Sequence, residues 1–164
     1  FLATRTMRAD LNKRQKDLGF EVSIKKLSPR VLDIRGKVDL PKGSRVRVEL
    51  YDEDYKPTEL KSFGWDIDQT RTLLVENGVH GMYVDKGEFH RKYDFNKDLK
   101  QYPFAKDRYI LKVSVDPRDH AEDVSLNVLG LMGEGLAEQK YLDKSDPTDH
   151  KLVKIFHLQR KDII

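Results

Sequence analysis

The sequence predicts a mainly β protein, folded as an antiparallel β-sandwich of the immunoglobulin or fibronectin type III kind. Apolar and polar residues alternate along several short segments, which is the period of strands that bury one face. Turn residues separate these segments at hairpin-sized intervals, and no rhythm of strand, helix and strand is present. Hydrophobic residues make up 38% of the chain and charged residues 36%, a balance that disfavours a parallel sheet covered on both faces.

The first three strands are expected in the segments FEVSIKK, LDIRGKVDL and SRVRVEL. Every second residue in each is mostly apolar, so one face is buried. Residues 41–43, Pro-Lys-Gly, predict a tight turn, because proline presets φ and glycine supplies the left-handed conformation. A hairpin around this turn would pair Val38 with Val46 and Ile34 with Leu50.

The later elements are weaker in pattern, and they follow in order along the chain. They are a short strand at 72–76, a hairpin around a turn at 85–87, a strand at 109–115, a short helix near 120–129 and a final strand in the segment HKLVKIFHLQR. Gly130 follows the expected helix and is a helix-ending signal.

Two regions divide the chain: residues 1–19, a basic arm or helix, and residues 20–164, a single β-sandwich domain. In the first region Met7, Leu11 and Leu18 form a thin apolar stripe, and Gly19 is a helix C-terminal signal. The region is expected to be a frayed arm or a docked helix. The chain opens on Phe1 without an initiator methionine, so we expect that a preceding segment was removed, and that segment could have contained a signal peptide or an anchor. Membrane contact is expected only through such an anchor.

The composition excludes several classes of function. With 0 Cys, disulfides, thiolate catalysis and cysteine zinc sites are ruled out. The net charge is +3, from 31 Lys plus Arg against 28 Asp plus Glu, and the two signs are interspersed. A nucleic-acid partner is therefore not expected, since it requires clustered positive charge.

Loop aromatics are the first candidate binding residues. Tyr55, Phe63, Trp65 and Tyr83 are expected to form a platform for a sugar ring or a peptide, because such side chains offer large contact areas at low entropic cost. The alternative is that Trp65 caps the end of the sandwich core. No cofactor is expected from these residues.

Loop acids are the candidates for a metal or for catalysis. Asp143, Asp146 and Asp149 could supply the oxygen ligands that calcium prefers, although the spacing of an EF-hand is missing. The alternative is a set of solvated turn carboxylates. Asp66 and Asp68, beside the tryptophan, would suit a hydrolase if an aromatic wall raised the pKa of one of them.

The segments LPKGSRVRVELYD, DKGEF, RYILKVSVDP and LGLMGEGL resemble a group of uncharacterised bacterial cell-envelope proteins and lipoproteins with an immunoglobulin-like sandwich. The resemblance spans residues 20–136. It implies an extracytoplasmic location, secreted or membrane-anchored, and no known enzyme activity.

The expected function is therefore a non-enzymatic binding or assembly module whose partner is a protein or glycan of the cell envelope. Residues 55–78 are the first expected contact surface, and the sheet edges are the second, through addition of a partner strand. The alternatives are a carboxylate- or metal-dependent hydrolase and a cytoplasmic protein-interaction adaptor.

Overall fold

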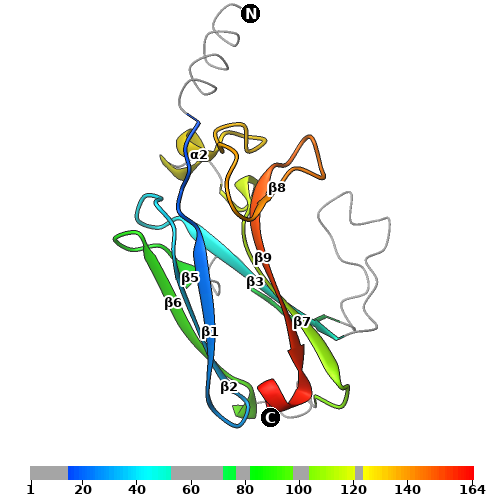
Figure 1. Cartoon of the computed structure of the whole chain (residues 1–164). Helices are drawn as coiled ribbons and strands as arrows, with labels where there is room; N and C mark the ends of the chain where they lie inside the picture. Colours follow the sequence, from blue (N-terminus) through cyan, green and yellow to red (C-terminus); the bar gives the residue numbers. More distant parts are fainter. Residues whose placement is uncertain (1–14, 53–71, 77–81, 98–103, 121–123) are drawn as a thin grey trace, which may run out of the picture.

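Two antiparallel sheets face each other in the computed structural model, which describes residues 15–52, 72–76, 82–97, 104–120 and 124–164 (Figure 1). The first sheet has the order β1 (Glu21–Ser28), β2 (Val31–Lys37) and β6 (Glu88–Asp94). The second has the order β4 (Thr72–Glu76), β3 (Arg45–Asp52), β7 (Arg108–Val115), β9 (Lys151–Gln159) and β8 (Leu142–Asp143), with β5 (Met82–Tyr83) also paired to β3. The helical elements are η4 (Phe95–Lys97), η5 (Pro117–Asp119), α2 (Val124–Leu129) and η6 (Arg160–Asp162).

The core consists of the apolar residues that the alternation of apolar and polar positions predicts to be buried. Val48 pairs with Val113 and Leu50 with Leu111 across β3 and β7, and all four side chains are buried between the sheets. Each such side chain contributes roughly 1.5 to 3 kcal/mol when it leaves water. The prediction of a mainly β, antiparallel sandwich is confirmed at this level.

The predicted hairpin between the second and third strands is wrong. β2 pairs with β1 and β6, whereas β3 pairs with strands of the other sheet, so Ile34 lies opposite Ile24 and not Leu50. The turn itself forms: Ser44 N–H donates to the Pro41 carbonyl at 3.1 Å, and Gly43 has φ +89°. The chain crosses from one sheet to the other here, because a turn fixes a reversal of direction but not the sheet that the next strand joins.

The second predicted hairpin fails for the same reason. Its turn forms, with Asp85 N–H donating to the Glu88 carbonyl at 2.9 Å. Met82, however, pairs with Val46 of the second sheet, while β6 belongs to the first. Both turns therefore carry the chain between sheets.

The end of the N-terminal region packs against the sandwich in a non-helical conformation. The expected helix included residues 15–18, but Lys16 instead forms a parallel bridge with Leu136, and Leu18 is buried in the core. Residues 1–14 of that prediction lie outside the described residues. The short helix near 120–129 is confirmed as α2, which ends before Gly130 at φ +78°.

The described residues contain no helix long and apolar enough to cross a membrane.

Candidate functional site

Most of the predicted binding and catalytic residues lie outside the described part of the chain. This applies to the aromatics Tyr55, Phe63 and Trp65 and to the acids Asp66 and Asp68. Tyr83 is described: it lies on β5 opposite Arg45, and 40% of it is exposed. The aromatic platform stays a prediction.

The three aspartates predicted to bind calcium do not come together in one site. Asp143 accepts hydrogen bonds from the backbone N–H and the hydroxyl of Ser145, and Asp146 accepts the equivalent pair from Thr148. Asp149 is turned into the protein and is 2% exposed. In the part of the chain that the structure describes, no three His, Asp or Glu side chains are grouped so as to hold a metal ion.

Asp149 belongs to a buried charge network at the end of β7 and the start of β9. Because Val115 pairs with Leu152, the next residues, Asp116 and Lys151, meet at this end of the sheet. Arg118 approaches both aspartates, with Nη2 3.0 Å from Asp116 Oδ2 and Nε 3.0 Å from Asp149 Oδ2. The Lys151 ammonium lies 3.6 Å from Asp149.

The two buried aspartates have opposite pKa shifts. Burial raises the pKa of Asp149 to about 7, and the hydrogen bond and negative charge of Asp116 add to that shift. Burial also acts to raise the pKa of Asp116, but hydrogen bonds with Arg118 and Asp149 outweigh it and hold that pKa below its usual value. The pair therefore shares one proton near neutral pH.

His120 and Arg47 extend this network beneath η5. Arg45 N–H donates to His120 Nε2 at 2.9 Å, so the ring proton is on Nδ1, which donates to the Asp116 carbonyl at 2.9 Å. The Arg47 guanidinium makes two hydrogen bonds to Asp119, one from Nε at 3.0 Å and one from Nη2. These hydrogen bonds hold His120 and Asp119, whereas Asp149 Oδ1 and Oδ2 are buried without a hydrogen-bond partner among the described residues and are paired with Arg118 and Lys151 by charge. The network therefore stabilises this end of the sandwich, and Asp149 is closed to a substrate.

A second carboxylate cluster lies on the outer face of the first sheet. Asp33 accepts two hydrogen bonds from Arg35, at 3.0 and 2.6 Å, and pairs with His90 on β6. Burial acts to raise the pKa of Asp33, but the hydrogen bonds from Arg35 and His90 outweigh it and lower that pKa. The carboxylate is thus saturated by two neighbouring side chains and is covered by them.

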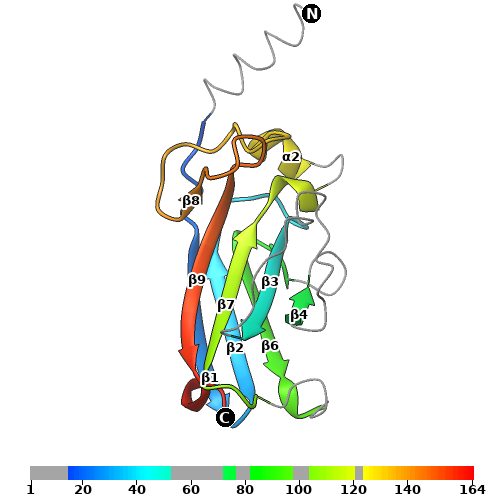
Figure 2. The same ribbon diagram turned by 90° about the vertical axis from the view of Figure 1, so that its right-hand side faces the viewer.

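The strands β1 and β9 are edge strands on the same side of the sandwich, as both Figure 1 and Figure 2 show. Among the described strands, β1 pairs only with β2. β9 pairs with β7 along its length and with β8 at Lys151 and Leu152. We call this side, bounded by β1 and β9, the open side. No hydrogen bond joins the two strands, both of which are fully described.

The open side is closed at its two ends. At one end, Leu18 N–H donates to Gln139 Oε1 at 2.9 Å, and the Phe20 ring packs edge-on against Tyr141. At the other end, Lys26 Nζ donates to the carbonyls of Lys161 and Ile164, at 3.1 and 2.7 Å. Between these contacts, no strand that the structure describes pairs with the outer edge of β1 or of β9.

Apolar side chains of the inner faces remain half-buried along the open side. Ile24 pairs with Ile34, and Phe156 with Leu111; the partner is buried in each pair, whereas Ile24 and Phe156 are only partly covered. Val22 and Leu158 are also only partly covered, and they pack against the core. In a closed sandwich the inner faces of the two sheets cover each other. On the open side, part of the apolar surface of both inner faces therefore stays accessible.

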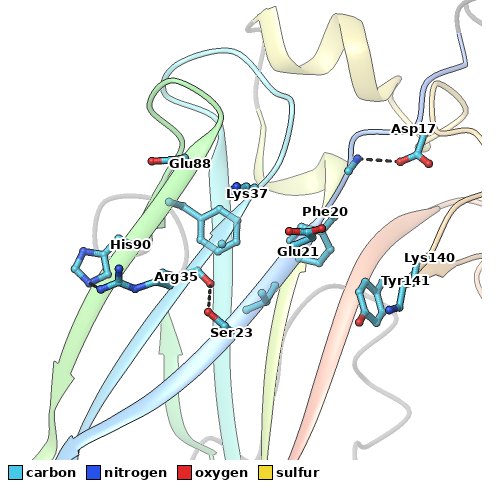
Figure 3. A pocket seen from close by; sticks show the side chains of 14 residues that line it. Asp17, Phe20, Glu21, Ser23, Arg35, Lys37, Glu88, His90, Lys140 and Tyr141 are labelled. Atoms are coloured by element: carbon cyan, nitrogen blue, oxygen red, sulfur yellow. Dashed lines mark hydrogen bonds between the residues drawn. The ribbon is translucent and has the colours of Figure 1, made fainter.

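A pocket of about 850 Å³ lies at the end of the open side nearest Tyr141 and extends around the start of β1 (Figure 3). Phe20, Val22 and Tyr141 line it together with polar side chains that include Lys140 and Arg35. Neither Asp116 nor Asp149 lines this pocket. Asp149, whose pKa is raised, is therefore separate from this pocket.

Tyr141 has a backbone conformation that is unusual for a side chain of its kind. Its φ is +70°, in the left-handed region that favours glycine. Lys154 Nζ lies 4.7 Å and Lys140 Nζ 5.1 Å from its ring centroid, and Val153 N–H donates to the Tyr141 carbonyl at 2.8 Å. Hydrogen bonds with two lysines lower the pKa of the Tyr141 hydroxyl, and the one with Lys154 contributes more than the one with Lys140.

The sequence predicted the sheet edges as a contact surface, but it did not predict that the edges of β1 and β9 lie on one side of the molecule. Val22, Ile24, Phe156 and Leu158 read as ordinary inward residues, and only the positions of β1 and β9 in the two sheets show that they are half-covered. Lys154 on the inner face was the one local irregularity that could have identified it, since a charge there interrupts the apolar alternation. No protein-family model matches the chain, and no curated protein is similar to it.

Proposed function

We propose that this chain is a non-enzymatic binding or assembly module of the bacterial cell envelope, located outside the cytoplasm, that holds an extended segment of a protein partner along its open side. The observation that carries the proposal is the half-buried apolar surface between two unpaired strand edges. Of the two expected contact surfaces, the sheet edges are the one that lies within the described residues.

The order of strands supports an immunoglobulin or fibronectin type III sandwich. β1, β2 and β6 follow the order of strands A, B and E, and β3, β7 and β9 follow that of C, F and G, in an immunoglobulin constant domain. In this arrangement the first and last strands lie at the same side, which is where the open side is found.

Strand addition suits this surface for two physical reasons. The free edge of a strand offers unpaired backbone N–H and C=O groups, and an extended peptide satisfies them with its own. Its alternate side chains would also cover Ile24 and Leu158, and completing the burial of such a side chain contributes roughly 1 kcal/mol.

Among the described residues, the position of the ionisable groups favours a binding role over a hydrolase. Asp149 is the described carboxyl whose pKa is raised to about 7, but it is 2% exposed and is paired with Asp116 and Arg118. A general acid must reach a substrate, and this one reaches only its neighbours.

The binding proposal is tested by selecting ligands from a library of random peptides of about twelve residues displayed against the full chain. We expect extended apolar peptides to be recovered, and Leu158→Lys to weaken their binding by at least about tenfold. Ile155→Lys is the matched control, because Ile155 lies on the same strand but on the outer face, paired with Lys112.

Failure to recover any peptide, or equal binding to both variants and the unmodified chain, would overturn strand addition at the open side. Circular dichroism establishes that both variants are folded, and Ile24→Ser replaces Leu158→Lys if the latter is not.

The compartment is tested separately, from the coding sequence before Phe1. A signal or anchor segment there supports a location outside the cytoplasm, and an initiator codon directly before Phe1 contradicts it.

A further inference from the structure

We propose that the open side recognises an acidic side chain of the bound segment, held between the ammonium groups of Lys140 and Lys154 beside the Tyr141 ring. This inference rests on the proposed function and specifies its partner: an extended protein segment in which Asp or Glu alternates with apolar residues.

The three residues form a cluster at one end of the open side. Lys154 is on the inner face of β9, opposite Val113, and its ammonium lies near the rings of both Tyr141 and Phe156, at 4.7 and 5.1 Å. Lys140 approaches the same Tyr141 ring from the loop before β8. Two cations thus converge on one aromatic side chain.

The charge of this cluster is not balanced within the described residues. Neither Lys140 nor Lys154 has a carboxylate within ion-pair distance, whereas Lys16 and Lys144 on the same end of the molecule each have one, Asp39 and Glu138. A lysine on the inner face of a sandwich would ordinarily be replaced by an apolar residue or paired. A carboxylate supplied by the partner would complete the cluster.

The surroundings favour a protein carboxylate over a free anion or a polyanion. Phe156 and Leu158 continue from Lys154 at every second position of β9, so the basic end of the surface passes directly into an apolar one. The pocket that contains Lys140 and Tyr141 is lined by acids as well as bases, Asp17 and Glu21 among them, so it offers no continuous positive surface to a nucleic acid or polyphosphate. A single carboxylate on an otherwise apolar extended segment suits both the basic end of this surface and its apolar continuation.

The spacing defines a sequence pattern for the partner. Side chains on one face of a strand recur at every second residue, in the partner as in β9. A segment lying along the open side would therefore place its acidic residue opposite Lys154 and apolar residues two and four positions away, opposite Phe156 and Leu158.

The backbone of Tyr141 is held in place for such a role. Its positive φ is maintained by the hydrogen bond from Val153 and by the contact of its ring with Phe20. Backbone conformations of this kind concentrate at binding sites, where the surrounding structure fixes them.

The test uses peptides recovered from the random library as probes, each compared with a Glu→Gln or Asp→Asn version of itself. We expect recovered peptides to carry the acidic and apolar pattern, and loss of the charge to weaken binding at least about fivefold at low salt. Lys154→Gln should produce the same loss for the acidic peptide but no further loss for the amide version, as a double-mutant cycle requires. Lys112→Gln, a lysine on the outer face of β7, is the matched control.

The results separate this inference from the function on which it rests. If Leu158→Lys weakens binding while the acidic and amide peptides bind equally well, strand addition stands and acid recognition is overturned. If Lys154→Gln weakens both peptides equally, the cluster contributes to shape alone and the inference is likewise overturned. If no peptide binds, both are rejected.

Discussion

Charged side chains gather at two places in this sandwich, and the two differ in how the charge is balanced. Around Asp116 and Asp149 every cation faces a carboxylate, and the side chains of both aspartates are almost wholly buried. Around Tyr141, Lys140 and Lys154 converge without a carboxylate among the described residues. In the first group each cation has a carboxylate within the chain, and in the second neither lysine has one among the described residues.

The difference indicates which part of the molecule maintains the fold and which is available for binding. A buried ion network that is complete costs much to break and gives a partner nothing to contact. A half-exposed basic cluster beside apolar surface costs little to alter and gains energy when a partner supplies the missing charge. Substitutions in the two regions should therefore separate effects on stability from effects on binding.

The largest effect is expected from Asp116→Ala. Removing this carboxylate takes from Arg118 its hydrogen-bonded partner and leaves Lys151 with Asp149 alone. It also removes the acceptor for Arg118 N–H at the start of η5. Loss of one partner of a buried ion pair costs about 3 to 5 kcal/mol of unfolding free energy. Urea denaturation measures it, with the exposed turn residue Asp146 as control.

Asp146→Ala should cost less than about 1 kcal/mol, because Asp146 only accepts hydrogen bonds from Thr148 in an exposed turn. Equal losses of unfolding free energy for the two variants would mean that the buried charge network around Asp116 does not stabilise the fold more than an exposed turn does.

The next effect compares two leucines on the inner face of the second sheet. Leu111→Ala should cost about 2 to 5 kcal/mol, since Leu111 is 1% exposed and its removal leaves a cavity. Leu158→Ala should cost less than half as much, because Leu158 is already partly open to water. Equal costs, measured by urea denaturation, would show that the open side is as well packed as the centre of the sandwich.

The pH dependence of stability should reveal the proton shared by the aspartates. The pKa of Asp149 is about 7 in the folded protein against 3.8 ordinarily, so the native state binds more protons than the unfolded state between these values. Its contribution to stability is complete below about pH 4 and is lost as the pH rises through about 7. The contribution of Asp116, whose pKa is lowered, is present above pH 3.8 and is lost as the pH falls further.

Asp149→Asn separates these contributions. The variant should lack the decline between about pH 4 and 7 and keep the acid-side loss that Asp116 causes. Urea midpoints measured across this range decide the matter, and an unchanged decline in the variant would assign it to another group.

The smallest effect on stability, and the clearest on association, is expected from Lys154→Val. Unfolding free energy should change by less than about 0.5 kcal/mol, because the ammonium is partly exposed. An inward-pointing charge on an edge strand guards against pairing with other copies, so the variant should form more dimers or larger species. Light scattering over a range of concentrations detects them, and Lys112→Val on the outer face should stay like the unmodified chain.

Much of the fold could be predicted because alternation reports burial directly. Val46, Val48 and Leu50 read as inward residues and are 0% exposed, and the weak strand signal at 72–76 corresponds to β4. Which strands pair with one another could not be predicted in the same way. The turns at 41–43 and 85–87 both form, yet each joins strands of different sheets, because local turn chemistry contains no information about sheet assignment.

The candidate site was less accessible to sequence reasoning for a related reason. Asp116 and Asp149 are far apart in sequence, and the pairing of β7 with β9, which ends at Val115 and Leu152, brings them together. Ile24 and Leu158 have the same pattern as fully buried residues, and their exposure follows from two edges lying on one side. Long-range pairing of this kind leaves no local signature.

The most direct test of the open side is a nuclear Overhauser measurement between an unlabelled library-selected peptide and the isotope-labelled chain. We predict contacts from the peptide to the methyl groups of Ile24 and Leu158, with the acidic residue of the peptide nearest Lys154. Contacts confined to Tyr83 or to residues 55–78 would contradict the account and place binding on the aromatic surface instead.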